Sequence, residues 1–247
     1  MEIHAKTIAQ ALGEITDRIA NAALRAQRNP AEVTLIAVSK TFPASAVLAA
    51  LAAGQRHFGE NRVEEALAKK AEVMRHASEV TWHLIGHVQS RKAKDVVGQF
   101  DWIHSVDSLK LAELMSRRTP TQPLNYSSTH LLLQCNVSGE VSKEGFDLAN
   151  WESEPAKFNL FADEVKKMLS LPALHIGGLM TMAPIVDDPA QAHPVFASLR
   201  GLRDALRERF PQLALPHLSM GMSDDFEAAI VEGSTMVRIG RAIFGGR

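Results

Sequence analysis

The stretch Val33-Thr-Leu-Ile-Ala-Val-Ser-Lys40 decides the fold class of this chain. Its first six residues are nearly all apolar, which is typical of a parallel β-strand that is buried on both faces. Pro43 follows closely and can open a helix, and Gly54 can end that helix. A buried strand followed by a helix is the repeating unit of α/β folds.

The same alternation of short apolar runs and helical patterns continues to the C-terminus. Further strands are predicted over residues 57–59, 81–85, 102–106, 129–136, 174–180, 215–218 and 236–239. Helices are predicted between the strands, and an extra amphipathic helix over residues 2–27 precedes the first one. Residues 119–128 contain two prolines and are predicted as a loop, and residues 137–154 as an irregular, mobile segment.

Eight strand–helix units in 247 residues predict one (β/α)₈ barrel, the TIM barrel, as a single domain over residues 1–247. Periodicity alone does not separate a closed barrel from an open doubly wound sheet. Polar or glycine residues follow nearly every predicted strand, and this favours the barrel. Asn61 with Glu64, and Asp224 with Glu227, have the spacing of capping boxes at helix starts.

Composition excludes several classes of protein. Hydrophobic residues make up 46% of the chain, which is enough for a sizeable core. The formal net charge of −1 argues against a nucleic-acid binder and against a polybasic membrane protein. The one cysteine, Cys135, leaves no intramolecular disulfide and fits a reducing compartment. Without a signal peptide or an apolar run near 18 residues, we expect a cytoplasmic protein.

Lys40 is the first candidate for chemistry, because the loops after the strands form the active face of such a barrel. It directly follows a buried apolar strand, and apolar surroundings favour the neutral amine over the ammonium. A neutral amine attacks aldehydes to form Schiff bases. The alternative is a lysine that pairs with Glu60 or reaches solvent.

The loop from Leu218 to Asp225 is small-residue-rich and leads into a helix. Its backbone N–H groups and the hydroxyls of Ser219 and Ser223 can surround an anion at a helix N-terminus. Phosphate sites in barrels often lie after strands seven and eight. The alternative is simple helix capping by Ser223 or Asp224. His83 and His87 lie four apart, but no further ligands cluster with them, and we expect no metal site.

Seven motifs occur in order along the chain. They are Ala37-Val-Ser-Lys40, Phe58-Gly-Glu-Asn61, Trp82-His-Leu-Ile-Gly86, Lys143-Glu-Gly145, Gly178-Leu-Met-Thr-Met182, Leu218-Ser-Met-Gly-Met-Ser223 and Val237-Arg-Ile-Gly240. Together they resemble the pyridoxal phosphate homeostasis protein family, the proline synthetase co-transcribed homologues. The resemblance runs from about residue 33 to the C-terminus.

The resemblance implies a fold like the N-terminal barrel of alanine racemase, with pyridoxal 5′-phosphate (PLP) held as an internal aldimine on Lys40. Arg238 would face the pyridine nitrogen, and Lys143 would be either a second, weaker cofactor contact or simply an exposed loop lysine. The other cofactor-binding positions that it implies are Asn61, His83, Ser219, Met220, Ser223 and Gly240. The implied role is vitamin B6 homeostasis: a cofactor carrier without established turnover, which delivers PLP to apo-enzymes.

Two alternatives stay open at this point. The first is a PLP-dependent amino-acid racemase on the same barrel, which would need a tyrosine as its second base. The only tyrosine, Tyr126, precedes the fifth strand, and the chain stops shortly after the eighth. The second is a Schiff-base aldolase with a sugar-phosphate substrate. We expect a monomer that binds PLP and apo-enzymes, but neither nucleic acid nor membranes.

Overall fold

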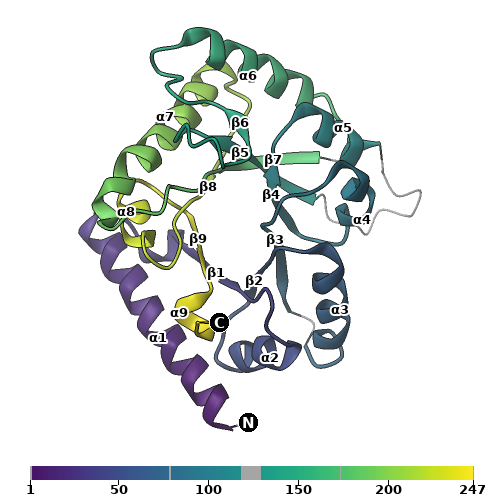
Figure 1. The fold of residues 1–247 in the computed structure, drawn as a ribbon, viewed down its shortest axis with the longest axis vertical. Helices are drawn as coiled ribbons and strands as arrows, with labels where there is room; N and C mark the ends of the chain where they lie inside the picture. Colours follow the sequence, from purple (N-terminus) through teal and green to yellow (C-terminus); the bar gives the residue numbers. More distant parts are fainter. Residues whose placement is uncertain (1, 78, 118–128, 173, 247) are drawn as a thin grey trace.

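The computed structural model describes residues 2–77, 79–117, 129–172 and 174–246, and Figure 1 shows an inner ring of strands with the helices outside it. The barrel strands are β1 (Thr34–Val38), β2 (His57–Glu60), β3 (Thr81–Leu84), β4 (Trp102–Val106), β5 (Thr129–Asn136), β7 (Leu174–Met180), β8 (His217–Ser219) and β9 (Met236–Ile239). Within the described residues these eight strands are parallel and pair in that order, and β9 pairs with β1. The predicted (β/α)₈ barrel is therefore confirmed.

A helix follows every strand of the barrel. The helices are α1 (Glu2–Arg25), α2 (Ala44–Ala52), α3 (Val63–Val73), α4 (Ala93–Val96), α5 (Leu109–Ser116), α6 (Pro155–Met168), α7 (His193–Arg209), α8 (Phe226–Val231) and α9 (Arg241–Phe244). The predicted N-terminal helix is α1, which lies beside α8 and α9 in Figure 1 and also packs on α2. Its buried residues Ile8, Leu12, Ile15 and Ile19 recur at helical spacing and form its core-facing stripe.

Two segments differ from the sequence-based predictions. Residues 137–154 include a short strand, β6 (Phe146–Asp147), which pairs with β5 beside the barrel, so this segment is not wholly irregular. Strand β8 begins at His217, two residues later than predicted, because Leu215 has a positive φ of 41° that does not fit a strand. The predicted loop over residues 119–128, including Tyr126, falls outside the described residues.

The two predicted capping boxes are wrong. Helix α3 begins at Val63 after Arg62, and α8 begins at Phe226 after Asp225, and neither has a side-chain cap. Their acidic first-turn residues pair with distant cations instead: Glu64 with Lys92, and Glu227 with Arg18 and Arg25. Asn61 therefore does not cap α3.

The interior of the barrel is partly polar. A small apolar cluster of Ile36, Leu132, Met180 and Met236 lies inside the ring of strands, and buried histidines, a serine and an arginine fill further inward-facing positions. Within the described chain, no helix combines the length and hydropathy that a bilayer crossing requires.

Candidate functional site

A cavity of about 500 Å³ opens at the carboxyl ends of β1, β2, β8 and β9. Five of the eight predicted site residues line it: Lys40, Asn61, Ser223, Arg238 and Gly240. Apolar side chains on its walls include Phe42, Ile85, Met182 and Met222. These residues come from strands far apart in the sequence, and they meet because all carboxyl ends of a parallel barrel share one face. A second cavity, of about 400 Å³, lies between α2 and the segment after α3 that contains His76, Ala77 and Glu79, and none of the predicted site residues lines it.

The other three predicted residues, His83, Ser219 and Met220, are fully buried and do not line this cavity. The Ser219 hydroxyl is engaged by side chains inside the barrel, and its role as a direct anion contact stays a prediction. It accepts a hydrogen bond from Nη1 of Arg238 at 2.6 Å and bonds Nδ1 of His104 at 2.9 Å. Ser219 therefore contacts Arg238, which lines the cavity, but does not line the cavity itself.

Arg238 brings a fixed cation to the cavity. Its guanidinium is held by Ser219 and by the backbone carbonyl of Thr181, to which Nη2 donates at 2.9 Å. Burial lowers the pKa of Arg238 to about 10, and the nearby Asp225 carboxylate opposes this shift. The side chain thus stays protonated at neutral pH, so it can donate hydrogen bonds but cannot accept them.

Three histidines continue the polar contacts from Ser219 through the barrel. His104 bonds His83 at 2.9 Å, and His83 bonds His57 at 3.1 Å. Burial lowers the pKa of His83 and His104 well below the usual range, neighbouring histidines lower both further, and Arg238 also lowers that of His104. Both rings are therefore neutral. His57 and His104 were not predicted as part of the site, although the inward-facing positions of adjacent strands could have indicated them.

The loop after β8 makes a tight turn. Gly221 has φ 95°, and a Cβ there would lie 2.7 Å from Cβ of Ala229, so only glycine fits. The two aspartates that follow have partners: Asp225 accepts from the backbone N–H of Met222 at 2.6 Å, and Asp224 pairs with Arg241 at 2.5 Å. Their charges are thereby partly offset beside the cavity.

Gly240 marks a second close approach, after β9. A Cβ at this position would lie 3.0 Å from the carbonyl oxygen of Val38. The absence of a side chain keeps the cavity wall open on the side where β1 and β9 pair.

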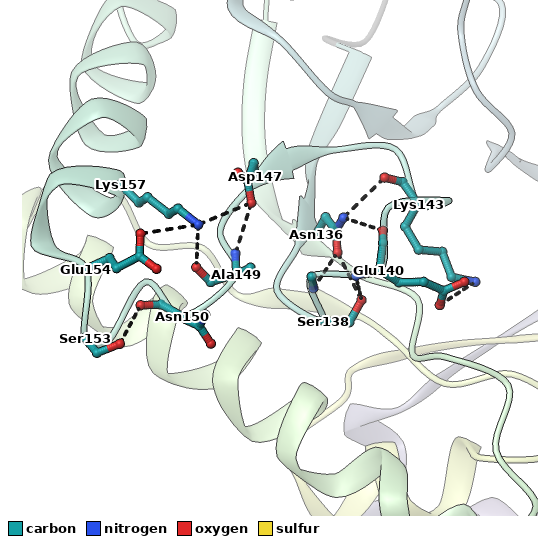
Figure 2. Close-up of polar contacts among 11 residues, drawn as sticks. Asn136, Ser138, Glu140, Lys143, Asp147, Ala149, Asn150, Ser153, Glu154 and Lys157 are labelled. Carbon is teal, nitrogen blue, oxygen red and sulfur yellow. Dashed lines mark hydrogen bonds and ion pairs between the residues drawn. The ribbon is translucent and has the colours of Figure 1, made fainter.

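The segment after β5 is organised by hydrogen bonds, as Figure 2 shows. Nδ2 of Asn136 donates to the backbone carbonyls of Glu140 and Lys143 at 3.0 and 3.2 Å, and its Oδ1 accepts from Ser138. The Lys143 ammonium lies 3.8 Å from a Glu140 carboxylate oxygen and does not line the 500 Å³ cavity. Lys143 as a second cofactor contact stays a prediction.

His83 and His87, which are four residues apart, lie in different surroundings. His83 bonds only rings inside the barrel, whereas Nδ1 of His87 lies 2.9 Å from Glu144 and 3.2 Å from Asp107. In the part of the chain that is described, no group of three or more histidine, cysteine, aspartate or glutamate side chains could hold a metal ion.

Comparison with known proteins fits this arrangement. Residues 12–247 match the family model described as alanine racemase, N-terminal domain. The chain is 46% identical to the pyridoxal phosphate homeostasis protein of Pseudomonas aeruginosa over 243 residues, which are 98% of this chain and 96% of that one. The chain belongs to the pyridoxal phosphate homeostasis protein family. The resemblance found in its motifs is thereby confirmed.

Solved structures extend the comparison. PipY of Synechococcus elongatus, whose structure was solved with PLP bound, is 43% identical, with a TM-score of 0.76 over 94% of this chain and 100% of that one. Alanine racemase of Corynebacterium glutamicum is 17% identical, with a TM-score of 0.64 over 98% of this chain and 61% of its own. The second likeness shows a shared barrel fold alone.

Proposed function

We propose that the cavity at the carboxyl ends of the strands binds PLP and that the protein is a cytoplasmic cofactor carrier in vitamin B6 homeostasis rather than a dedicated enzyme. The observation that carries this proposal is the convergence of Lys40 and the buried Arg238 on one cavity of about 500 Å³. That volume lies within the usual range for small-molecule sites. The family's name and the PLP-bound relative support it.

The residues present fit this cofactor. When bound, PLP would supply an aldehyde group, and the Lys40 amine would be the residue that attaches to its carbon, with the aldehyde oxygen released as water. The hydroxyl of Ser223 can donate to a phosphate oxygen, and Gly240 leaves space for the phosphate beside β1. Asn61 supplies a further polar group to the cavity lining. Ser219 accepts a hydrogen bond from Arg238, and Met220 and His83 are buried in the barrel without lining the cavity.

Arg238 is compatible with a carrier, which needs no carbanion stabilised on its cofactor. A carboxylate beside the ring nitrogen would keep that nitrogen protonated and stabilise a carbanion on a substrate. A cationic donor in the same place holds its own proton and leaves the ring nitrogen unprotonated. We therefore expect amino-acid racemisation below about 1 s⁻¹, the low end of ordinary enzyme turnover.

The proposal includes the finer expectations about assembly. The whole chain, residues 1–247, would act as one PLP-binding domain and as a monomer. Its partners would be apo forms of PLP enzymes. Incubation of the PLP-loaded protein with an apo-transaminase tests delivery, and recovered transaminase activity is the expected result.

The decisive experiment is Lys40→Ala. Alanine has no amine, so we expect the variant to lose the borohydride-reducible attachment of PLP and its visible absorption band, while weak non-covalent binding remains. The wild-type adduct should map to Lys40 in a peptide digest, and the exposed Lys110→Ala serves as the control. An undiminished adduct in Lys40→Ala that maps to another lysine, such as Lys143, would refute the assignment. A colourless wild-type protein would favour the aldolase alternative.

A further inference from the structure

The backbone conformation directly after Lys40 is unusual. Lys40 lies between the end of β1 and Thr41, whose φ of 69° falls in the left-handed region. A β-branched residue rarely adopts this conformation, and it persists only where surrounding contacts impose it. Contacts that impose it would also determine where the Lys40 side chain starts.

Two side chains of α3 supply such contacts, one on each side of Lys40. Nζ of Lys69 donates to the carbonyl oxygen of Ser39 at 2.7 Å, which fixes the peptide group before Lys40. The backbone N–H of Thr41 donates to Oε1 of Glu65 at 2.5 Å, which fixes the peptide group after it. Glu65 and Lys69 are four residues apart, so they lie on one face of α3.

A buried carboxylate completes the arrangement. Oε1 of Glu60 accepts from Lys69 at 2.5 Å and from the Ser39 hydroxyl at 2.6 Å. The Glu60 side chain is 0% exposed and that of Lys69 5%, and the same ammonium lies 3.4 Å from Glu65. Glu60, which its sequence position made a candidate partner of Lys40, forms an ion pair with Lys69.

Burial of this ion pair indicates a role in geometry rather than stability. Taking two charges out of water costs as much as their attraction returns, so buried pairs are weak sources of stability. Oε2 of Glu60 is buried without a hydrogen-bond partner, and burial raises the pKa of this carboxyl despite Lys69 and Ser39. A purely apolar contact between α3 and the barrel would avoid these costs, but it could not hold two peptide groups.

We propose that Glu65 and Lys69 are positioning residues for Lys40, which hold the peptide groups on both sides of it so that its amine is presented to the cavity in one orientation. The proposal rests on the proposed function only in what it says of reactivity. The two hydrogen bonds that hold these peptide groups, Lys69 to the Ser39 carbonyl and the Thr41 N–H to Glu65, are called the clamp here, and they concern the protein alone. Because the Lys69 ammonium is engaged by three oxygens, its task is to hold the turn and not to bind PLP covalently.

The first test needs no cofactor. Amide hydrogen exchange at Thr41, followed by NMR, is compared in the PLP-free wild type, Glu65→Ala and Glu65→Gln. Glu65→Ala removes the acceptor, so Thr41 exchange should accelerate about tenfold or more, as expected for a lost hydrogen bond to a charged group. Glu65→Gln keeps an oxygen acceptor and should restore most of the protection. Unchanged exchange in Glu65→Ala would overturn the clamp.

The second test measures how fast PLP becomes borohydride-trappable on Lys40. Glu65→Ala should slow attachment about tenfold, with Glu65→Gln close to wild type, by the same loss of one charge-assisted hydrogen bond. Lys69→Met should be slowed and Lys69→Arg partly rescued. The exposed Glu72→Ala on the same helix is the control. Attachment at the wild-type rate in Glu65→Ala would overturn the positioning role.

The two tests separate this inference from the proposed function. If the wild type attaches no PLP at Lys40 while Glu65→Ala still releases the Thr41 amide, the proposed function fails and the clamp stands. If the wild type attaches PLP and neither Glu65→Ala nor Lys69→Met alters its rate, the proposed function stands and the positioning role fails. Circular dichroism of each variant confirms that it is folded, and the Glu65 pair decides the result if Lys69→Met does not fold.

Discussion

Acidification below pH 6.5 is expected to destabilise this protein steeply, because His83 and His104 fold as neutral rings. Both are fully buried, and burial holds the pKa of both well below the ordinary histidine value of 6.5. As the pH falls below 6.5, the unfolded chain binds protons at these residues and the folded chain does not. Their contribution to stability is therefore complete above pH 6.5 and is lost progressively as the pH falls toward the folded-state pKa values.

The size of the effect follows from linkage. One pH unit below the unfolded pKa, each non-titrating buried histidine costs about 1.4 kcal/mol, so the pair costs about 2.8 kcal/mol between pH 8 and pH 5.5. Glu60 and Asp225 have raised pKa values and act with the opposite sign, because the folded state protonates first. Their effect is common to wild type and variant and cancels in a comparison between them.

Urea unfolding at pH 8 and pH 5.5 of wild type and His104→Gln tests this reasoning. Glutamine does not titrate, so the variant should lose about 1.4 kcal/mol less than wild type over this interval, although it is less stable at both pH values. The exposed His76→Gln is the matched control and should behave as wild type. A stability difference between wild type and His104→Gln that does not depend on pH would refute the neutral, buried assignment.

Two further predictions separate roles that the sequence does not distinguish. Ser219→Ala should lower the free energy of unfolding by about 1.5–3 kcal/mol in urea, because the buried guanidinium of Arg238 loses an acceptor. Ser223→Ala should weaken PLP binding in a titration, while its free energy of unfolding stays within about 0.5 kcal/mol of wild type. Leu199→Ala, fully buried on α7, should cost about 2–5 kcal/mol in urea unfolding, and Leu160→Ala, 67% exposed on α6, should cost less than about 0.5 kcal/mol.

Most of the barrel could be predicted because its strands are buried on both faces. Such strands are short apolar runs, and residues 174–180 were predicted with the bounds that β7 has. The start of β8 could not be predicted, because the positive φ of Leu215 has no signal in its residue type. The two-residue strand β6 is likewise too short to produce a pattern.

The candidate site was predicted where position after a strand sufficed, as for Lys40 and Gly240. It was missed where a contact joins distant segments. Lys69 reaches the carbonyl of Ser39 from 30 residues away, and its place on an amphipathic helix predicts only a solvated face. Ser219 was predicted as an anion contact because its hydroxyl is in the right loop, and only the structure shows that Arg238 and His104 use it.

The cation at the cavity depends on the neutral rings beneath it. Arg238 is 5% exposed, and a single hydroxyl oxygen, that of Ser219, separates its guanidinium from the ring of His104. A proton on His104 would place two buried cations two hydrogen bonds apart, one on either side of that oxygen, and in an interior of low dielectric this repulsion is costly. Neutral histidines, by contrast, can accept and donate along the chain to His57 without adding charge. The charge of Arg238 at the barrel mouth is therefore compatible with an interior of polar groups only because those groups stay uncharged.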